Sequence, residues 1–210
     1  DEGPWTSFAG LISHAGQGYS ARKAEDLAEI AFGEAEVLAG LKARLAETGI
    51  PVPTISVGAT PTCLGAPIPP GIDEIRPGNY AFLDRTALRL GICSADDLVV
   101  SVVASVVGRR ERHAIIDAGS KTLSSDGGPH GTSIGGFGIV KMADESSNRN
   151  WLVEKLSEEH GFVACADEDL RIGDRVRVFP NHACATVACF NAYGGEGALN
   201  WPVDARGCLI

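Results

Sequence analysis

The chain has 210 residues, 44% of them hydrophobic, so it is long enough to bury a sizeable core in one or two domains. A formal net charge of −9 argues against nucleic acid or an anionic membrane surface as a partner, and no stretch approaches about 18 uninterrupted apolar residues or resembles a signal peptide. The six cysteines lack the spacing of a disulfide framework, so we expect reduced thiols in a cytoplasmic protein.

The first predicted elements follow a strand, helix, strand order. Residues 8–14 form a short apolar run that ends in polar side chains, which is typical of a strand in an α/β protein. Residues 21–48 carry apolar side chains at helical steps, with Ser20 placed to cap the helix and Gly49 placed to end it. Residues 52–58 predict a buried parallel strand. We therefore expect a βα repeat in this part of the chain.

The character of the sequence changes after about residue 96. Residues 63–76 are rich in proline and glycine and predict a loop. Residues 98–107, 113–117 and 136–141 predict strands, and residues 150–159 fit helical and strand periodicity equally well.

The second half shows no long amphipathic helix, so we expect it to be a mostly antiparallel β domain. We place the boundary near residues 90–97, which gives domains at 1–92 and 93–210. The predicted fold class is α/β plus β.

A histidine and a cysteine follow the last predicted strand. Residues 172–179 alternate apolar and charged side chains, which predicts a half-buried strand. If the extended backbone continues past Pro180, His182 and Cys184 point to the same face. Imidazole and thiolate on one face supply part of a zinc site and leave positions open for water or substrate, as in a catalytic metal centre. The alternative is a buried histidine and a buried cysteine that bind no metal.

Two loops carry the small and hydroxyl residues from which phosphate sites are built. Residues 56–62, SVGATPT, follow a predicted strand, and residues 76–80, RPGNY, add backbone amides, a guanidinium and a phenol. Alone, each loop is also compatible with an ordinary turn. Together, in consecutive βα units, they match what a barrel's phosphate site requires.

Two further clusters hold carboxylates and histidines. In residues 117–131, glycines allow tight turns that bring Asp117, Asp126 and His130 together, or form a hairpin with solvated carboxylates. Residues 157–161, SEEHG, either support a metal-binding histidine or form a solvated turn.

Taken in order, six motifs resemble the D-serine dehydratase and D-threonine aldolase family, the fold type III pyridoxal-phosphate enzymes. They are HAGxxY at 14–19, SVGATPT at 56–62, EIRPGNY at 74–80, DAGSKTLSSDGGPHG at 117–131, SEEHG at 157–161 and PNHAC at 180–184. The resemblance covers nearly the whole chain. It implies the C-terminal part of a TIM-type, alanine-racemase-like barrel that holds the cofactor, followed by a D-serine dehydratase-like β domain that carries the metal.

The resemblance implies pyridoxal 5'-phosphate and zinc as cofactors. It assigns the cofactor to Tyr19, Thr60, Gly78 and Asn79, of which the last three hold the phosphate, and the metal to His182 and Cys184. The HAC sequence at 182–184, followed by ATVACF, resembles D-serine dehydratases, which convert D-serine to pyruvate and ammonia. The alternative is a D-threonine aldolase, which gives glycine and an aldehyde.

The family's cofactor lysine lies upstream of the HAGxxY motif, and the chain begins just before that motif. None of its five lysines lies in the family's sequence context. We therefore expect the Schiff-base lysine and about half the barrel to be absent and these residues alone to be inactive, with a non-catalytic fragment or pseudoenzyme as a further alternative. The complete enzyme is expected to be a homodimer that acts on a D-amino acid.

Overall fold

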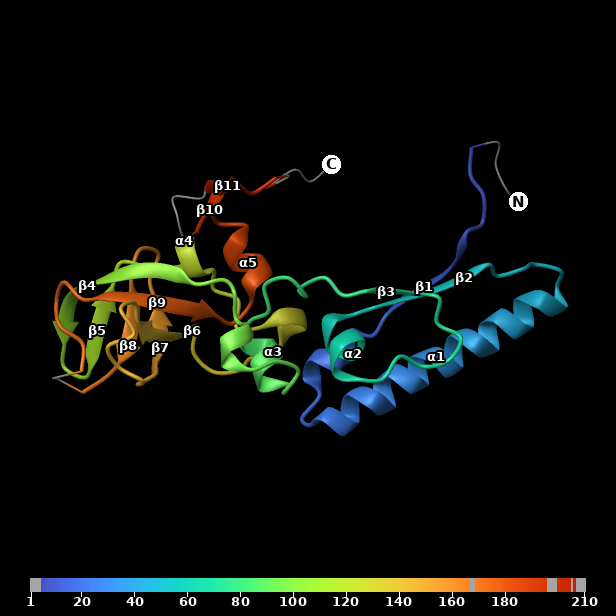
Figure 1. Cartoon of the computed structure of the whole chain (residues 1–210), viewed down its shortest axis with the longest axis horizontal. Coiled ribbons are helices and arrows are strands. Elements are labelled where there is room, and N and C mark those ends of the chain that lie inside the picture. The colour runs from blue at the N-terminus through green and yellow to red at the C-terminus, as the bar shows by residue number, and fades with distance from the viewer. Residues whose placement is uncertain (1–4, 167–168, 196–199, 205, 207–210) are drawn as a thin grey trace. The chain divides into compact units, whose positions relative to one another are not determined.

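The computed structural model of the chain describes residues 5–166, 169–195, 200–204 and 206 (Figure 1). The chain divides into two units. Unit 1 holds residues 1–80 and 87–94, and unit 2 holds residues 81–86 and 95–210. None of the helices in the described ranges combines the length and apolar character needed to cross a membrane.

Unit 1 is built on a three-stranded parallel sheet in the order β1-β2-β3. Its strands are β1 (Gly10–His14), β2 (Thr54–Gly58) and β3 (Glu74–Arg76). Its helices are the 3-10 helix η1 (Gly16–Ser20), α1 (Ala24–Glu47) and α2 (Thr60–Gly65), and α3 (Arg85–Arg89) ends in this unit. The expected βα repeat is therefore present. The chain returns through a helix after each of the first two strands.

Two expectations for unit 1 are corrected by the structure. Ser20 does not cap the long helix, because it lies in η1. Asp26 performs the capping instead, and its carboxylate accepts the backbone N–H groups of Arg22 and Lys23 at 3.0 and 3.3 Å. The predicted loop at 63–76 begins inside α2 and ends as β3, which pairs with β2.

One face of the unit 1 sheet packs against α1. Leu38 of α1 lies in a buried cluster with Val52, Ile55 and Val57. Residues paired across neighbouring strands share a face of the sheet, whereas successive residues along one strand alternate between faces. Ser56 lies between Ile55 and Val57, and Arg76 pairs with Gly58, so the side chains of Ser56 and Arg76 lie on the face opposite this cluster. That second face is where the polar side chains of the sheet collect.

Unit 2 contains a closed six-stranded barrel in the order β4-β5-β8-β7-β6-β9, with antiparallel pairing throughout. Its strands are β4 (Val102–Arg110), β5 (His113–Ile116), β6 (Gly138–Met142), β7 (Trp151–Leu156), β8 (Gly161–Ala164) and β9 (Arg175–Pro180). The ambiguous segment at 150–159 is thus a strand. The antiparallel β domain expected from the sequence is found.

Shorter elements connect and follow the barrel strands. They are the 3-10 helices η2 (Ala95–Asp97) and η3 (Pro129–Gly131), helices α4 (Ser120–Leu123) and α5 (Ala183–Val187), and the antiparallel pair β10 (Ala192–Gly194) and β11 (Asn200–Pro202). In Figure 1, α5 directly follows β9, the last strand of the barrel.

Side chains fill the barrel interior. Along β4, Val102, Ala104 and Val106 are buried, whereas Val103 and Val107 are exposed. This alternation is hidden in the sequence, where all of these positions are apolar. The buried residues of the other strands meet those of β4 in one core, as expected for a small barrel whose interior is packed rather than open.

Candidate functional site

The predicted metal residues of unit 2 lie in contact with each other and with a carboxylate. His182 Nδ1 lies 2.6 Å from Asp126 Oδ2. Hydrogen bonds from the imidazole to Cys184 and to Asp126 raise the pKa of His182 to about 9, although burial lowers it. Since Asp126 holds Nδ1, the ring nitrogen available to a metal is Nε2. Cys184 is exposed, so its sulfur is accessible.

The backbone that carries His182 and Cys184 differs from the predicted continuous strand. The condition of an extended backbone past Pro180 holds only as far as His182, because β9 ends at Pro180 and Cys184 lies in the first turn of α5. His182 is the extended residue that precedes the helix, with φ −137° and ψ 102°. The side chains of His182 and Cys184 still interact, because the side chain of the residue before a helix lies toward the second and third helical residues, and Cys184 is the second.

The donor set suits a metal that keeps open coordination positions. Within the described part of the chain, no three His, Cys, Asp or Glu side chains form a group that could hold a metal ion. Two protein ligands leave coordination positions of a tetrahedral metal that water or a bound molecule could fill, as the open position of catalytic zinc is filled. A carboxylate on the second nitrogen of a metal-binding imidazole fixes the ring orientation, and Asp126 is placed for this role.

The two predicted phosphate loops of unit 1 meet at the carboxyl ends of β2 and β3. The backbone N–H of Asn79 donates to Thr60 Oγ1 at 3.0 Å. Thr60 is buried, and a Cβ built on Gly78 would have no atom within 4 Å, so the backbone there is open to a ligand. Tyr19 follows β1 at the same edge of the sheet, and its carbonyl accepts a hydrogen bond from Arg89.

Arg76 organises the polar face of the unit 1 sheet. Its Nε donates to Ser56 Oγ at 2.8 Å, and its Nη2 donates to the carbonyl of Ser13. The Ser56 hydroxyl in turn donates to Glu74. A Cβ on Gly58 would lie 3.0 Å from Arg76 Nη1, so glycine lets the guanidinium lie across β2. The sequence offered Arg76 only as a member of its loop. The network could not be predicted because it depends on strand register.

The two remaining predicted clusters, residues 117–131 and 157–161, make different contacts in the structure. Of the residues 117–131, Asp126 reaches His182, whereas Asp117 accepts the backbone N–H of Ser105 at 2.7 Å. In the 157–161 segment, Glu158 and Glu159 both pair with Lys121. The carboxylates of that segment therefore bind a lysine rather than supporting a metal histidine.

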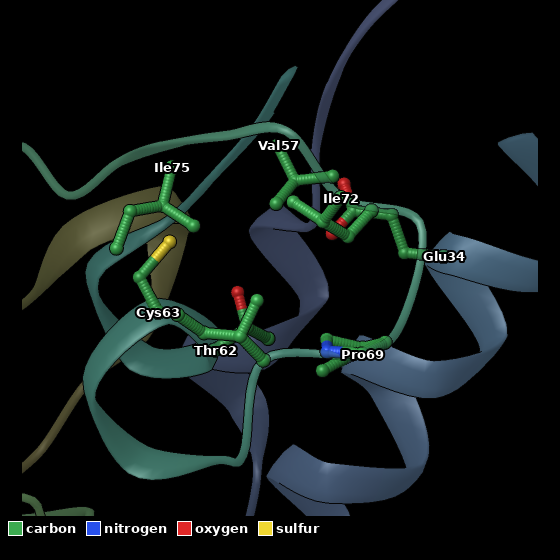
Figure 2. A pocket seen from close by; sticks show the side chains of 9 residues that line it. Glu34, Val57, Thr62, Cys63, Pro69, Ile72 and Ile75 are labelled. Atoms are coloured by element: carbon green, nitrogen blue, oxygen red, sulfur yellow. The ribbon is translucent and has the colours of Figure 1, made fainter. Parts of the chain in front are cut away.

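A small cavity lies on the helical side of the unit 1 sheet (Figure 2). Its volume is about 10 Å³, which is room for no more than one water molecule, so it cannot receive a substrate. It is lined mainly by apolar side chains, together with Cys63 and Glu34. Oε1 of Glu34 is buried and has no hydrogen-bond partner among the described residues. Burial raises the pKa of the Cys63 thiol.

Residues 99–194 match a family model described as a putative serine dehydratase domain. This match includes Asp126, His182 and Cys184. Over 198 residues the chain is 35% identical to D-threo-3-hydroxyaspartate dehydratase of Delftia sp. strain HT23, covering 89% of this chain and 52% of the relative. It is 33% identical over 202 residues to D-serine dehydratase of Dictyostelium discoideum, covering 89% and 50%. The chain thus spans about half the length of these curated relatives.

Solved structures show the same likeness. The Delftia dehydratase superposes with a TM-score of 0.81 at 33% identity, over 92% of this chain and 55% of that one. Variants of it at a histidine and at a cysteine two positions apart have also been solved, the cysteine variant in a metal-free form. D-threonine aldolase from Filomicrobium marinum superposes with a TM-score of 0.76 at 25% identity, over 97% of this chain and 55% of that one.

Proposed function

The chain belongs to the D-serine dehydratase family of fold type III pyridoxal-phosphate enzymes, and from this we propose that it supplies the metal site and part of the cofactor site of a lyase. The proposed reaction is the conversion of D-serine to pyruvate and ammonia. The observation that carries the proposal is the contact of His182 with Asp126 and Cys184 inside the matched family domain.

The proposed metal is zinc, held by His182 Nε2 and the Cys184 thiolate. The Delftia relative supports this, because its solved variants concern a histidine and a cysteine with the same spacing and include a metal-free form. Zinc would supply Lewis acidity toward the substrate hydroxyl, and pyridoxal phosphate would supply an electron sink for charge at Cα. Asp126 would keep the imidazole oriented with Nε2 toward the metal.

The proposed cofactor contacts lie in unit 1. Thr60 offers a hydroxyl proton, since its oxygen already accepts the N–H of Asn79. The open backbone at Gly78 and the proximity of the two loops fit a phosphate group, which prefers backbone amides and hydroxyls. Tyr19 would line the pocket from the end of β1. We assign unit 1 to part of a TIM-type barrel, for which its parallel sheet and helical returns are the support.

These 210 residues alone are proposed to be inactive. Both lysines of unit 1, Lys23 and Lys42, lie at or on α1, so none is carried by the strands β1, β2 or β3. A lysine that bonds to the cofactor would have to reach it from the barrel. The homodimer implied by the family resemblance and the cytoplasmic location expected from the cysteines also stay predictions.

A D-threonine aldolase is the second candidate, because the aldolase structure superposes over nearly the whole chain. The two reactions differ in the bond that breaks, and the products identify it. The test is to assay the complete gene product, and separately the 210-residue chain, with D-serine and D-threonine in the presence and absence of a chelator. Pyruvate from D-serine that is lost with chelator supports the dehydratase. Glycine and an aldehyde from D-threonine, without pyruvate, would replace it with the aldolase.

A further inference from the structure

A buried polar network holds the backbone on both sides of His182. All of its members belong to unit 2, and they come from four places in the chain: residues 84–86, the loop at 127, the loop at 135–136 and the turn at 181–183. Asp84 and Asn181 are two of its deeply buried polar side chains, with exposed fractions of 3% and 1%. Polar groups buried this deeply cost stability unless they are hydrogen-bonded, and both are.

Asp84 acts as a helix cap supplied from a distant part of the chain. Its Oδ2 accepts the backbone N–H of Ala183 at 3.0 Å, and its Oδ1 accepts the N–H of Thr86 at 3.0 Å. The first residues of a helix have no partner inside the helix for their N–H groups, and His182, the residue before α5, makes no side-chain cap. Asp84 therefore frees the imidazole of His182 from capping and fixes the turn from which Cys184 projects.

Asn181 connects the same turn to the loops that carry Asp126. Its side-chain amide donates to the carbonyls of Gly127 and Gly136 at 3.1 and 2.7 Å, and its Oδ1 accepts from Arg85. The Thr86 hydroxyl donates to the Asn181 carbonyl at 2.9 Å. Because Gly127 follows Asp126 directly, the amide sets the distance between Asp126 and His182.

We propose that Asp84 and Asn181 are positioning residues that hold His182, Cys184 and Asp126 in the geometry that binds the metal. The inference rests on the metal site proposed above. Neither residue touches the metal. Each acts through the backbone of a ligand or through the loop that carries the carboxylate behind it. Groups of this kind typically change metal affinity by about 10- to 100-fold when they are removed.

The probe is Co²⁺ alone, titrated into the metal-free 210-residue chain while the charge-transfer absorbance between thiolate and cobalt is recorded. Wild type should bind one equivalent and develop the band. Asp84→Ala and Asn181→Ala should weaken binding by about 10- to 100-fold and reduce the band per bound ion. Asp84→Asn, which keeps one acceptor, should lie between wild type and Asp84→Ala, and it carries the same test if the alanine variant does not fold.

The matched control is Val163→Ala, which removes buried methyl groups from β8 in the same barrel. It should lower the thermal midpoint while leaving cobalt affinity and the band as in wild type, which separates positioning from general loss of stability. If wild type binds no cobalt through its thiolate, the proposed metal site fails. If wild type binds cobalt, and the Asp84 and Asn181 variants fold and bind cobalt equally well, the metal site stands and the positioning role is overturned.

Discussion

His182 Nδ1 lies 2.6 Å from Asp126 Oδ2, although the two residues are 56 positions apart in the chain. The contact joins two motifs that the sequence shows separately, the glycine-rich segment at 117–131 and the PNHAC segment at 180–184. A carboxylate on one nitrogen of an imidazole leaves the other nitrogen as the metal ligand and holds the ring in place. In the proposed metal site the two segments would therefore have different tasks. The PNHAC segment would provide the ligand, and the glycine-rich segment would orient it.

Replacing Cys184 by alanine should remove zinc binding. The side chain is one of only two proposed protein ligands, and a single imidazole does not hold zinc at micromolar concentration. We expect a loss of at least about 100-fold in affinity, measured by competition with a chromophoric chelator. Cys189→Ala is the control, because that sulfur donates to the carbonyl of Ala185 within the same segment. Equal zinc affinity for Cys184→Ala and wild type would rule out the metal assignment.

The strand periodicity of the sequence predicted many of the strands but not how they pair to close the barrel. Alternation identified residues 172–179 as a strand, and β9 is found at Arg175–Pro180. The closure of the barrel could not be predicted, since it depends on pairing between β4 and β9, where Val102 lies opposite Val178. Contacts of such long range leave no local pattern.

The geometry of the candidate site was only partly accessible for the same reason. The spacing of His182 and Cys184 suggested a shared face, and the two side chains do meet, but through a helix instead of a strand. Residues 183–187 are too few to show helical periodicity. What caps this helix is Asp84, 99 residues earlier, and no sequence pattern connects the two.

Cys63 should react slowly with iodoacetamide in the folded chain. Its thiol is buried and burial raises its pKa, so the reactive thiolate is scarce near pH 8, whereas Cys184 is exposed. We expect at least about a tenfold difference in alkylation rate between the two, followed by mass spectrometry of the peptides. The difference should disappear in denaturant. Equal rates in the folded chain would contradict the burial of Cys63.

The same shift predicts a pH dependence of stability. The folded chain keeps the Cys63 proton at a pH where the unfolded chain, with the ordinary pKa of 9.0, has lost it. The unfolded state then binds fewer protons, so the free energy of unfolding should fall as the pH rises above 9.0. Denaturant unfolding of wild type and Cys63→Ala across this range measures the effect. The variant should show the smaller decline.

Replacing Glu34 by leucine should stabilise unit 1. Oε1 of Glu34 is buried without a hydrogen-bond partner among the described residues, and it faces a cavity lined by side chains such as Val57 and Ile72 (Figure 2). Removing an unsatisfied polar atom from apolar surroundings should raise the free energy of unfolding by about 1 kcal/mol. Glu36→Leu, on an exposed position of α1, is the control and should change it by less than about 0.5 kcal/mol. A destabilised Glu34→Leu would show that the carboxylate has a role in the fold.

Gly119→Ala should destabilise unit 2. A Cβ at this position would lie 2.3 Å from the carbonyl oxygen of Glu158 and 2.5 Å from the backbone nitrogen of His160, so backbone would have to move. We expect a loss of about 1–3 kcal/mol in the free energy of unfolding, measured with denaturant. Gly108→Ala is the matched control, because its Cβ would meet nothing closer than a side-chain atom at 3.6 Å. Similar stabilities for the two variants would show that the 119 and 157–160 segments do not pack this closely.

The last prediction is that these 210 residues alone neither form a Schiff base with pyridoxal phosphate nor convert D-serine to pyruvate. A lysine that attacks the cofactor needs a lowered pKa. Lys121, the only lysine inside one of the six family motifs, has the opposite environment, since hydrogen bonds to Glu159 and Glu158 raise its pKa. Lys23 precedes α1 and pairs with Asp26. Lys141 lies over the ring of Phe179.

The measurement is to incubate the purified chain with pyridoxal phosphate, add borohydride, and locate any trapped cofactor by mass spectrometry. Pyruvate formation from D-serine is followed in parallel. We expect no specific site of trapping and no pyruvate above a protein-free control containing the same cofactor and zinc. Lys121→Gln serves as the comparison, and it should be indistinguishable from wild type. Stoichiometric trapping at Lys121 that this variant abolishes, or turnover of D-serine by the chain alone, would show that the chain carries its own cofactor lysine.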